Sequence, residues 1–392
     1  MFGDHDLAVN FSVPFRYAVH FTERVFDPDN AVLVEALRRL ETARRHRVLV
    51  IIDDGVARAH PGSMAAVRAY ADAHAASIEL LGEPLIVPGG EQAKNDPAIV
   101  SSLQRQMAAL GVDRQSFCLV IGGGAVQDMA GFAAATCHRG VRVVRVPTTV
   151  LGQNDSGVGV KNGVNAFGMK NFVGSFAVPF AVINDFEFLA TLSRRDRVAG
   201  MAEAVKVALI RDARFFEWLC EHASELARLE PSATAVMIRE CARLHVEHIA
   251  GGGDPFELGS ARPLDYGHWA AHKLESLTAH RLRHGEAVGI GLALDTRYSV
   301  EVGLLDAGTG ERITRLLIDL GFRLYDPALE LRDKSGQLRV LEGLREFREH
   351  LGGELTVSLL AAPGRGVNVN EMDFSRVVRC IDWLAERYRD AA

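Results

Sequence analysis

The stretch CLVIGGGAVQDMAGFAAA, residues 118–135, places an apolar run directly before three glycines and an apolar helical pattern. The continuous apolar residues 118–121 are typical of a strand buried on both faces. Gly122, Gly123 and Gly124 would let the backbone approach a pyrophosphate, whose charge is favoured at a helix N-terminus. The stretch matches neither GxGxxG nor GxxxxGKS/T. It predicts a strand–turn–helix unit, with a nucleotide site and a plain tight turn as alternatives for the glycines.

Strand and helix patterns alternate on both sides of this unit, which predicts a parallel sheet with helices on both faces. The expected strands are a pair within 11–26 and single strands at 47–53, 78–87, 117–121 and 177–185, with helices at 31–45, 61–74 and up to residue 110. Ligands collect at the carboxyl ends of such strands. The turns that carry Asp53, Glu91 and Lys94 are therefore candidate ligand contacts, with solvated loop charges as the alternative. From Thr191 onward long amphipathic helices replace the strands.

Composition limits the classes of protein to which the chain can belong. The 392 residues are 48% hydrophobic and 24% charged, with a net charge of −6, as expected for a globular protein of two domains. No lysine- or arginine-rich run favours nucleic acid as a partner, and no apolar run reaches the ~20 residues of a membrane span. The N-terminus lacks the pattern of a signal peptide. Five scattered cysteines without a CxxC pair predict a reducing, cytoplasmic location.

Residues 153–171 combine four glycines, four asparagines and two lysines with little strand or helix periodicity. A long loop of this kind is costly to order without a function. Lysine ammonium groups and asparagine amides among exposed backbone N–H groups suit a bound phosphate. The sequence predicts a phosphate-binding loop here, with a mobile surface loop as the alternative.

The helical half contains a second group of candidate ligands. Glu203 lies on a largely apolar helix, where an acid is costly unless it is paired with a cation or a metal. Lys206 is an intrahelical partner for it. His268 and His272 are four residues apart on one helix face, and His284 opens the next helix. Three histidines among several carboxylates in residues 254–288 suggest a divalent metal, with ordinary surface or capping histidines as the alternative.

Six motifs, in this order, carry a resemblance to a known family: GGGxxxDxAGFxAA, RGVxxxxVPTTxLxQxDxxxGxK, GxKN, GxAExxK, GHxxxHxxE and HGEAVxIG. With their spacing from about Asp53 to Val288, they resemble the 3-dehydroquinate synthase-like sugar phosphate cyclases. The resemblance implies an α/β, Rossmann-like NAD-binding domain over residues 1–186. It also implies an all-α, metal- and substrate-binding domain over residues 187–392.

The resemblance also implies NAD, a Zn²⁺ or Co²⁺ ion and a set of site residues. Those that match the family's metal ligands are Glu203, His268 and His284. Those that match its NAD contacts are Asp53, Glu91, Lys94, Gly123, Gly124, Asp128, Thr148, Thr149, Lys170, Phe188 and Thr191. The active-site positions are Asp155, Lys161, Asn171, Lys206 and His272, of which Lys161, Asn171 and His272 would bind the phosphate. Arg139 matches a residue that reaches the phosphate from a neighbouring subunit, which implies a homodimer.

In this family NAD oxidises a secondary alcohol of a sugar phosphate, phosphate is eliminated and the ketone is reduced again. Ring opening and an intramolecular aldol closure then give a carbocycle. NAD is regenerated in each turnover, and Lys206 would stabilise developing negative charge. The resemblance thus implies a phosphate-eliminating carbon–oxygen lyase that acts on a small sugar phosphate.

The chain departs from the synthases where these read DERESGLRxLLNxGH, because residues 254–268 read DPFELGSARPLDYGH. The arginine that would bind a substrate carboxylate is Ala261, and the asparagine is Asp265. Arg262 is one residue later, which turns a helical side chain by ~100°. Similarly, an upstream lysine is replaced by His245 or His248, and residues 348–353 read REHLGG where the synthases carry paired lysines.

An added aspartate would repel a substrate carboxylate and accept hydrogen bonds from sugar hydroxyls instead. The departures resemble the valiolone-type cyclases, which act on sedoheptulose 7-phosphate. We therefore expect a cyclase that makes a C7 cyclitol, and the alternatives are 3-dehydroquinate synthase itself and a metal- and NAD-dependent polyol dehydrogenase. The dehydrogenases usually have an aspartate among their metal ligands, where this chain has Glu203. A catalytically dead binding protein would not need the metal and phosphate positions to be kept.

Overall fold

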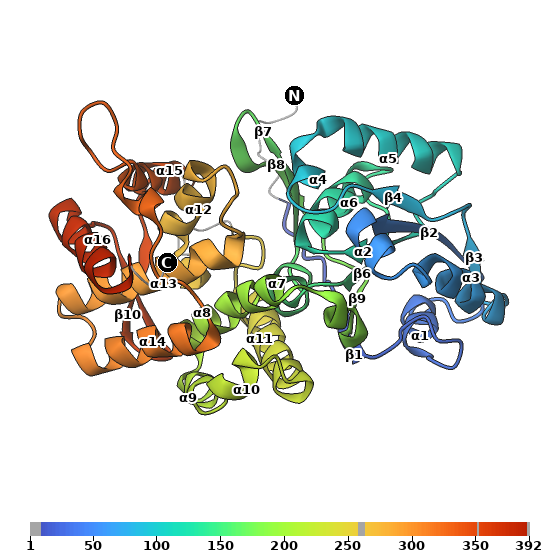
Figure 1. Ribbon diagram of the computed structural model, residues 1–392. Helices are drawn as coiled ribbons and strands as arrows, with labels where there is room; N and C mark the ends of the chain where they lie inside the picture. Colours follow the sequence, from blue (N-terminus) through green and yellow to red (C-terminus); the bar gives the residue numbers. More distant parts are fainter. Residues whose placement is uncertain (1–8, 258–262, 351–352, 390–392) are drawn as a thin grey trace, which may run out of the picture.

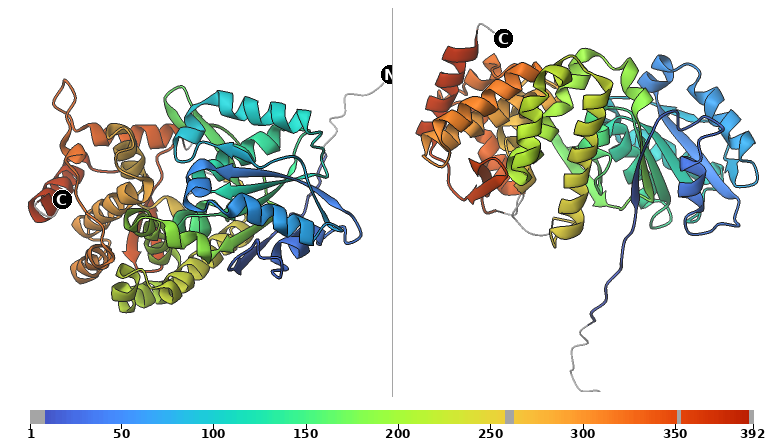
Figure 2. Two further views of the ribbon diagram at one scale, coloured as in Figure 1. Left: turned by 45° about the vertical axis from the view of Figure 1, so that its right-hand side comes forward. Right: turned by 90° about the horizontal axis from the view of Figure 1, so that it is seen from below.

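The computed structural model describes residues 9–257, 263–350 and 353–389. A sheet-containing half and a helical half lie side by side in every view (Figures 1 and 2). No helix in the described ranges is long and apolar enough to cross a membrane.

The first half is built on a 7-stranded sheet in the order β1-β9-β6-β5-β2-β3, with β4 also paired to β2. All of these pairings are parallel. The strands are β1 (Ala18–Thr22), β2 (His46–Asp53), β3 (Ile78–Leu80), β4 (Leu85–Val87), β5 (Phe117–Gly122), β6 (Arg142–Pro147) and β9 (Ala181–Asp185). The helices are α1 (Val32–Arg38), α2 (Asp54–Ala59), α3 (Ser63–Ala73), α4 (Gln92–Asn95), α5 (Pro97–Ala109) and α6 (Gly124–Thr136). The predicted α/β architecture is confirmed.

Alternate residues of β2 face two separate cores, because side chains of a strand point to opposite sides of the sheet. Val48, Val50 and Ile52 pack with residues of α1 and α3. Leu49 and Ile51 pack with residues of α5 and α6. Burial on both faces explains why the strand sequence is continuously apolar.

Several predicted boundaries in the first half are wrong. Residues 11–26 contain one strand, β1, and not a pair, and the helix predicted at 31–45 ends at Arg38. The strand predicted at 78–87 is split into β3 and β4 around Gly82, whose φ of 75° turns the chain between them. A positive φ is compatible with glycine and interrupts an extended strand.

The loop predicted at 153–171 is more regular than expected. It begins with a π-helical turn, η1 (Gly152–Ser156), and continues into an antiparallel hairpin, β7 (Lys161–Ala166) and β8 (Met169–Phe176). In the hairpin Gly163 and Gly174 are so close that a Cβ on Gly163 would lie 2.9 Å from Val173 O. Small and polar residues at this contact hide the usual two-residue alternation of a strand, so the prediction failed.

The second half is helical, as expected, and also contains one hairpin. Its helices are η2 (Phe186–Thr191), α7 (Arg194–Ala199), α8 (Met201–Arg211), α9 (Ala213–Glu221), α10 (Ala223–Ala227), α11 (Pro231–Gly251), η3 (Pro263–Asp265), α12 (His268–Leu277), α13 (His284–Glu301), α14 (Ala307–Leu320), η4 (Pro327–Glu330), η5 (Arg339–Leu341), α15 (Glu342–His350) and α16 (Phe374–Tyr388). The hairpin consists of β10 (Val357–Ala362) and β11 (Arg365–Val369).

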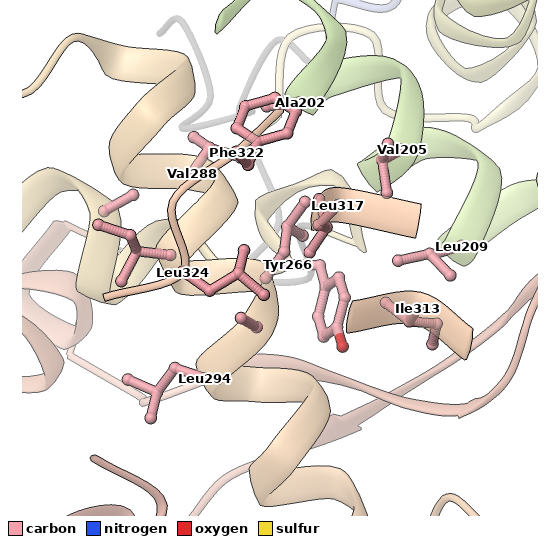
Figure 3. Close-up of a cluster of buried hydrophobic side chains, with 14 of the residues drawn as sticks. Ala202, Val205, Leu209, Tyr266, Val288, Leu294, Ile313, Leu317, Phe322 and Leu324 are labelled. Atoms are coloured by element: carbon pink, nitrogen blue, oxygen red, sulfur yellow. The ribbon is translucent and has the colours of Figure 1, made fainter. Parts of the chain in front are cut away.

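The core of this half packs α8 and α14 around α13. Figure 3 shows Leu209 of α8 and Ile313 of α14 near the ring of Tyr266, which precedes α12. Tyr266 is fully buried, and its hydroxyl is 2.7 Å from Thr296 Oγ1 on α13. The elements that carry Glu203, His268 and His284 are thereby packed into one core.

Close backbone contacts fix where α12 and α13 begin. A Cβ on Gly291 would lie 2.0 Å from Gly267 O, and one on Gly285 would lie 1.8 Å from Ala199 O. Gly267 N donates to Asp295 Oδ2 at 2.9 Å. His268 directly follows Gly267, and His284 directly precedes Gly285. The glycines therefore set the spacing of the two histidines.

We predict that Gly291→Ala lowers the free energy of unfolding by about 1–3 kcal/mol, because the new methyl group overlaps the Gly267 carbonyl. Urea denaturation measures the change. Gly251→Ala is the matched control, since no atom lies within 4 Å of its Cβ position. Equal stabilities of Gly291→Ala and Gly251→Ala would contradict the proposed contact.

Candidate active site

Glu203, His268 and His284 bring three potential metal ligands together. Their ligand atoms all lie within 4.8 Å of one another. Glu203 Oε1 is 3.5 Å from His268 Nε2 and 3.3 Å from His284 Nε2. The Glu203 side chain is fully buried, and neither of its oxygens has a partner with hydrogen-bond geometry among the described residues.

The other nitrogen of each imidazole shows which way its lone pair points. His268 Nδ1 lies 3.1 Å from Tyr266 O, and His284 Nδ1 lies 2.6 Å from Glu275 Oε1. Both Nδ1 atoms therefore donate, which directs the two Nε2 atoms at the Glu203 carboxylate. Burial lowers the pKa of His284, but Glu275 and Glu203 outweigh burial and raise it to about 9, so its Nε2 carries a proton toward Glu203 when no metal is bound. A bound divalent ion would replace that proton between the three groups. This donor set, with two His and one Glu, fits a divalent ion such as zinc.

A second group of potential ligands, His272, Glu275 and His284, overlaps the first. Both oxygens of Glu275 are already engaged, one by His284 and the other by Lys170 Nζ at 2.5 Å. His272 is exposed. The Glu203 group is the better metal site because it is more buried and because the Nε2 atoms of both its histidines face Glu203.

Lys206, one turn after Glu203, is buried and contacts the Glu203 carboxylate. Burial lowers the pKa of Lys206, but Glu203, Asp155 and, more weakly, Asp265 outweigh burial and raise it above its usual value. Lys206 is therefore an ammonium group at neutral pH. Asp265, at the end of η3, is a half-buried acid on the same side as Lys206.

Asp155 of η1 extends this group toward α11. Its Oδ2 is 4.0 Å from Lys206 Nζ and its Oδ1 is 2.8 Å from His245 Nε2. His245 Nδ1 is 3.2 Å from Cys241 O, so both ring nitrogens face oxygen atoms. Burial raises the pKa of Asp155, but the charges of His245 and Lys206 outweigh it and lower the pKa.

The predicted phosphate residues lie on the β7–β8 hairpin and α12. Lys161 opens β7 and its Nζ is 2.6 Å from Glu257 Oε1. Asn171 of β8 has a φ of 55°, and its backbone N–H donates to Asn165 Oδ1. The His272 ring lies edge-to-face with His268 and stacked with His284, at centroid distances of 5.4 and 6.0 Å.

Apart from Lys170, which lies on β8, the predicted nucleotide contacts gather at or just after the carboxyl ends of β2, β4, β5, β6 and β9. Gly123 caps α6, where Gly124 begins the helix. A Cβ on Gly124 would lie 2.5 Å from Ser156 Oγ, and one on Gly89 would lie 2.3 Å from Asp53 Oδ1. Neither glycine could carry a side chain without meeting another one. The N-terminus of α6 supplies backbone N–H groups that suit a pyrophosphate, so this edge fits a dinucleotide.

Side chains at this edge hold one another in place through ion pairs and hydrogen bonds. Lys94 Nζ is 2.7 Å from Asp128 Oδ2, and Glu91 Oε1 accepts from Asn165 Nδ2 at 2.8 Å. Asp53 accepts from Gly55 N and so caps α2. Four more predicted contacts lie at this edge. Thr148 N donates to Gly122 O, and Thr149 Oγ1 accepts from Gly152 N. His60 joins the other two, because its Nε2 is 2.8 Å from Thr191 Oγ1 and its ring is 5.1 Å from that of Phe188.

Arg139 lies away from this group, on the exposed turn between α6 and β6. Its φ is 61°, and no hydrogen bond or ion pair joins it to another described residue. Ala261, which replaces the carboxylate-binding arginine of the synthases, and the neighbouring Arg262 lie outside the described residues.

Two residues of the site were not predicted from the sequence. Glu275 is buried, lies seven residues after His268 and hydrogen-bonds His284. Arg145 is buried in β6 and donates to the carbonyls of Gly157, Gly159 and Lys161 and to Asn162 Oδ1. It holds the segment between Asp155 and Lys161. The signals were an acid on an apolar helix face and an arginine within a run of valines.

Comparison with known proteins identifies the family of the chain. The chain matches the 3-dehydroquinate synthase N-terminal family over residues 84–199 and the 3-dehydroquinate synthase C-terminal family over residues 200–334. It is 37% identical to 3-dehydroquinate synthase of Halorhodospira halophila, covering 82% of this chain and 90% of that one. It is 36% identical to 2-epi-5-epi-valiolone synthase of Streptomyces glaucescens, covering 80% and 77%.

Solved structures give the same fold. ValA, a 2-epi-5-epi-valiolone synthase from Streptomyces hygroscopicus subsp. jinggangensis with NAD⁺ and Zn²⁺ bound, superposes with a TM-score of 0.85 at 28% identity, covering 97% of this chain and all of that one. A 2-deoxy-scyllo-inosose synthase complexed with carbaglucose-6-phosphate, NAD⁺ and Co²⁺ superposes with a TM-score of 0.67 at 23% identity, covering 90% and 91%. The chain belongs to the 3-dehydroquinate synthase-like family of sugar phosphate cyclases.

Proposed function

We propose that the chain converts sedoheptulose 7-phosphate to a C7 cyclitol, with loss of phosphate and an intramolecular aldol closure. The observation that carries this choice of substrate is the position of Asp265, an acid close enough to Lys206 to raise its pKa. A second carboxylate, brought by the substrate, would be repelled there. Sugar hydroxyls, in contrast, would donate to Asp265. The similarity to 2-epi-5-epi-valiolone synthases supports the same choice.

Glu203, His268 and His284 would hold a zinc or cobalt ion, and the edge around Gly123 and Gly124 would hold NAD. NAD supplies a transient oxidation that is reversed after phosphate has left, and the divalent ion supplies Lewis acidity. Support comes from the three ligand atoms that face one point, from the glycines at the N-terminus of α6 and from the NAD⁺ and Zn²⁺ bound to ValA.

The protein's own charged residues would stabilise the reacting oxygen and bind the phosphate. Lys206 stays protonated, so it can stabilise negative charge on a substrate oxygen. Asp155, held by His245, keeps its carboxylate directed at Lys206 and so fixes the ammonium group. Lys161, Asn171 and His272 are assigned to the phosphate, with Lys161 exchanging its ion pair with Glu257 for the substrate.

We also propose a homodimer in which Arg139 reaches the phosphate of the neighbouring subunit. Its exposure and the absence of a partner among the described residues support this role, because the guanidinium is free to bind an anion elsewhere. The division into an NAD-binding domain at residues 1–186 and a metal- and substrate-binding domain at 187–392 is supported by the last strand of the sheet, which ends at Asp185.

3-Dehydroquinate synthase is the second candidate function, because a relative of that name is 37% identical over 331 residues. A polyol dehydrogenase is less well supported. The similarity to a glycerol dehydrogenase, at 12% identity, shows the fold alone.

We predict phosphate release when the protein is incubated with sedoheptulose 7-phosphate, NAD and zinc or cobalt, and a cyclitol in the product NMR spectrum. NADH should not accumulate, because the oxidation is reversed within each turnover. Steady NADH formation with a simple polyol would instead identify a dehydrogenase. Growth rescue of a strain that lacks 3-dehydroquinate synthase, without turnover of sedoheptulose 7-phosphate, would contradict the proposed substrate.

We predict that Glu203→Gln reduces zinc affinity by more than the ~10–100-fold that changes in residues behind a metal ligand cause, because it removes a charged ligand. Competition with a chromophoric chelator measures the affinity. Glu311→Gln, on a carboxylate that is paired with Arg387, is the control and should bind zinc normally. Equal zinc affinity in both variants would rule out this metal site.

We predict that Arg139→Ala and Glu203→Gln, each inactive alone, restore activity when mixed and refolded together. In a heterodimer, one site combines an intact Glu203 with the partner's intact Arg139. Random pairing in a twofold dimer should therefore restore about one quarter of wild-type activity. If Arg139 served its own subunit, no site in the mixture would be complete and no activity would return.

A further inference from the structure

Glu275 is a buried carboxylate that has one partner for each oxygen. Only 3% of its surface is exposed, and it lies on the same face of α12 as His268, two turns earlier. Its Oε1 is 2.6 Å from His284 Nδ1, and its Oε2 is 2.5 Å from Lys170 Nζ. A buried charge is costly unless it is paired, so both contacts are needed to keep the carboxylate ionised.

The contact with His284 sets the orientation of that ring. With Nδ1–H donating to Glu275, Nε2 is the nitrogen directed at the metal site and lies 3.3 Å from Glu203 Oε1. A carboxylate behind a histidine ligand fixes the tautomer and makes the ligating nitrogen more basic. The orientation of the metal ligand thus depends on the position of Glu275.

The contact with Lys170 crosses from one half of the molecule to the other. Lys170 lies on β8, and Figure 1 shows the β7–β8 hairpin between α12 and α4. Burial lowers the pKa of Lys170, but Glu275, Glu91 and Asp128 outweigh burial and raise it. The ammonium group thus faces acids of the nucleotide-binding edge and an acid of the metal-binding half simultaneously.

We propose that Glu275 is a positioning residue that couples the two cofactor sites: its ion pair with Lys170 ties the β7–β8 hairpin to His284. The hairpin then cannot take its place over the nucleotide without also orienting the metal ligand His284. Each cofactor tightens the binding of the other by the same factor, as linkage requires. This inference rests on the proposed binding of NAD and a divalent ion.

The test is NAD titration, followed by fluorescence or calorimetry, of chelator-treated and zinc-loaded protein. In the wild type we expect zinc to tighten NAD binding by about 5-fold or more. Lys170→Met should bind zinc but show the same NAD affinity with and without it. A direct contribution of Lys170 to NAD binding would change both affinities and leave their ratio unaffected, so the ratio isolates the coupling.

Glu275→Gln should also lose the coupling and should bind zinc about 10–100-fold more weakly. In the cobalt-loaded protein its visible absorption bands should shift, because the His284 ring is less constrained. Glu342→Gln is the matched control. Glu342, on α15, pairs at 2.6 Å with Lys273, which lies on α12 as Glu275 does. It should retain both the zinc affinity and the coupling of the wild type.

The outcomes separate the inference from the proposed function. If the wild type binds neither zinc nor NAD, both are overturned. If it binds both but without coupling, or if Lys170→Met keeps the wild-type ratio, only the inference is overturned. Thermal unfolding checks that the variants fold. Should Glu275→Gln fail to fold, Lys170→Met, on a partly exposed hairpin side chain, decides the question alone.

Discussion

A fully buried carboxylate on an apolar helix is the constraint on which this site depends. Glu203 is surrounded on α8 by Ala202, Ala204 and Val205, all fully buried, so its charge has no solvent to stabilise it. Lys206 provides one cation, and Nε2 of each of two imidazoles lies within 3.5 Å of the same carboxylate. A divalent ion held by the two imidazoles and the carboxylate would supply further positive charge at this buried point.

This constraint explains features of the fold that are far from the carboxylate. Because His268 and His284 open their helices, their positions depend on where α12 and α13 begin. Gly267, Gly285 and Gly291 allow backbone approaches that any Cβ would block. Asp295, which accepts hydrogen bonds from Gly267 N and Trp269 Nε1, holds the start of α12 against α13. Packing therefore fixes the donor geometry before a metal binds.

The sequence was informative where chemistry and local pattern coincide. The strand–glycine–helix unit could be predicted because apolar runs and glycines are local signals. Histidine spacing alone suggested His268, His272 and His284, and Glu203 entered the ligand set only through the family resemblance, because it lies far from the histidines in the chain. The β7–β8 hairpin could not, because its glycines and asparagines, such as Asn162 under Arg145, serve long-range contacts and mask strand periodicity. Glu275 was missed for a similar reason: its importance depends on Lys170 and His284, which lie elsewhere in the chain.

The charges around Lys206 indicate the class of substrate more directly than any single residue does. Three acids, Glu203, Asp155 and Asp265, act on this one ammonium group. His245 Nε2 lies 2.8 Å from Asp155 Oδ1 and holds that carboxylate in place. A divalent ion would add positive charge and make the site attractive to a phosphate. It does not remove the acid at Asp265, which is placed to accept hydrogen bonds. A substrate that offers hydroxyl groups there gains hydrogen bonds, whereas one that offers a carboxylate meets like charge.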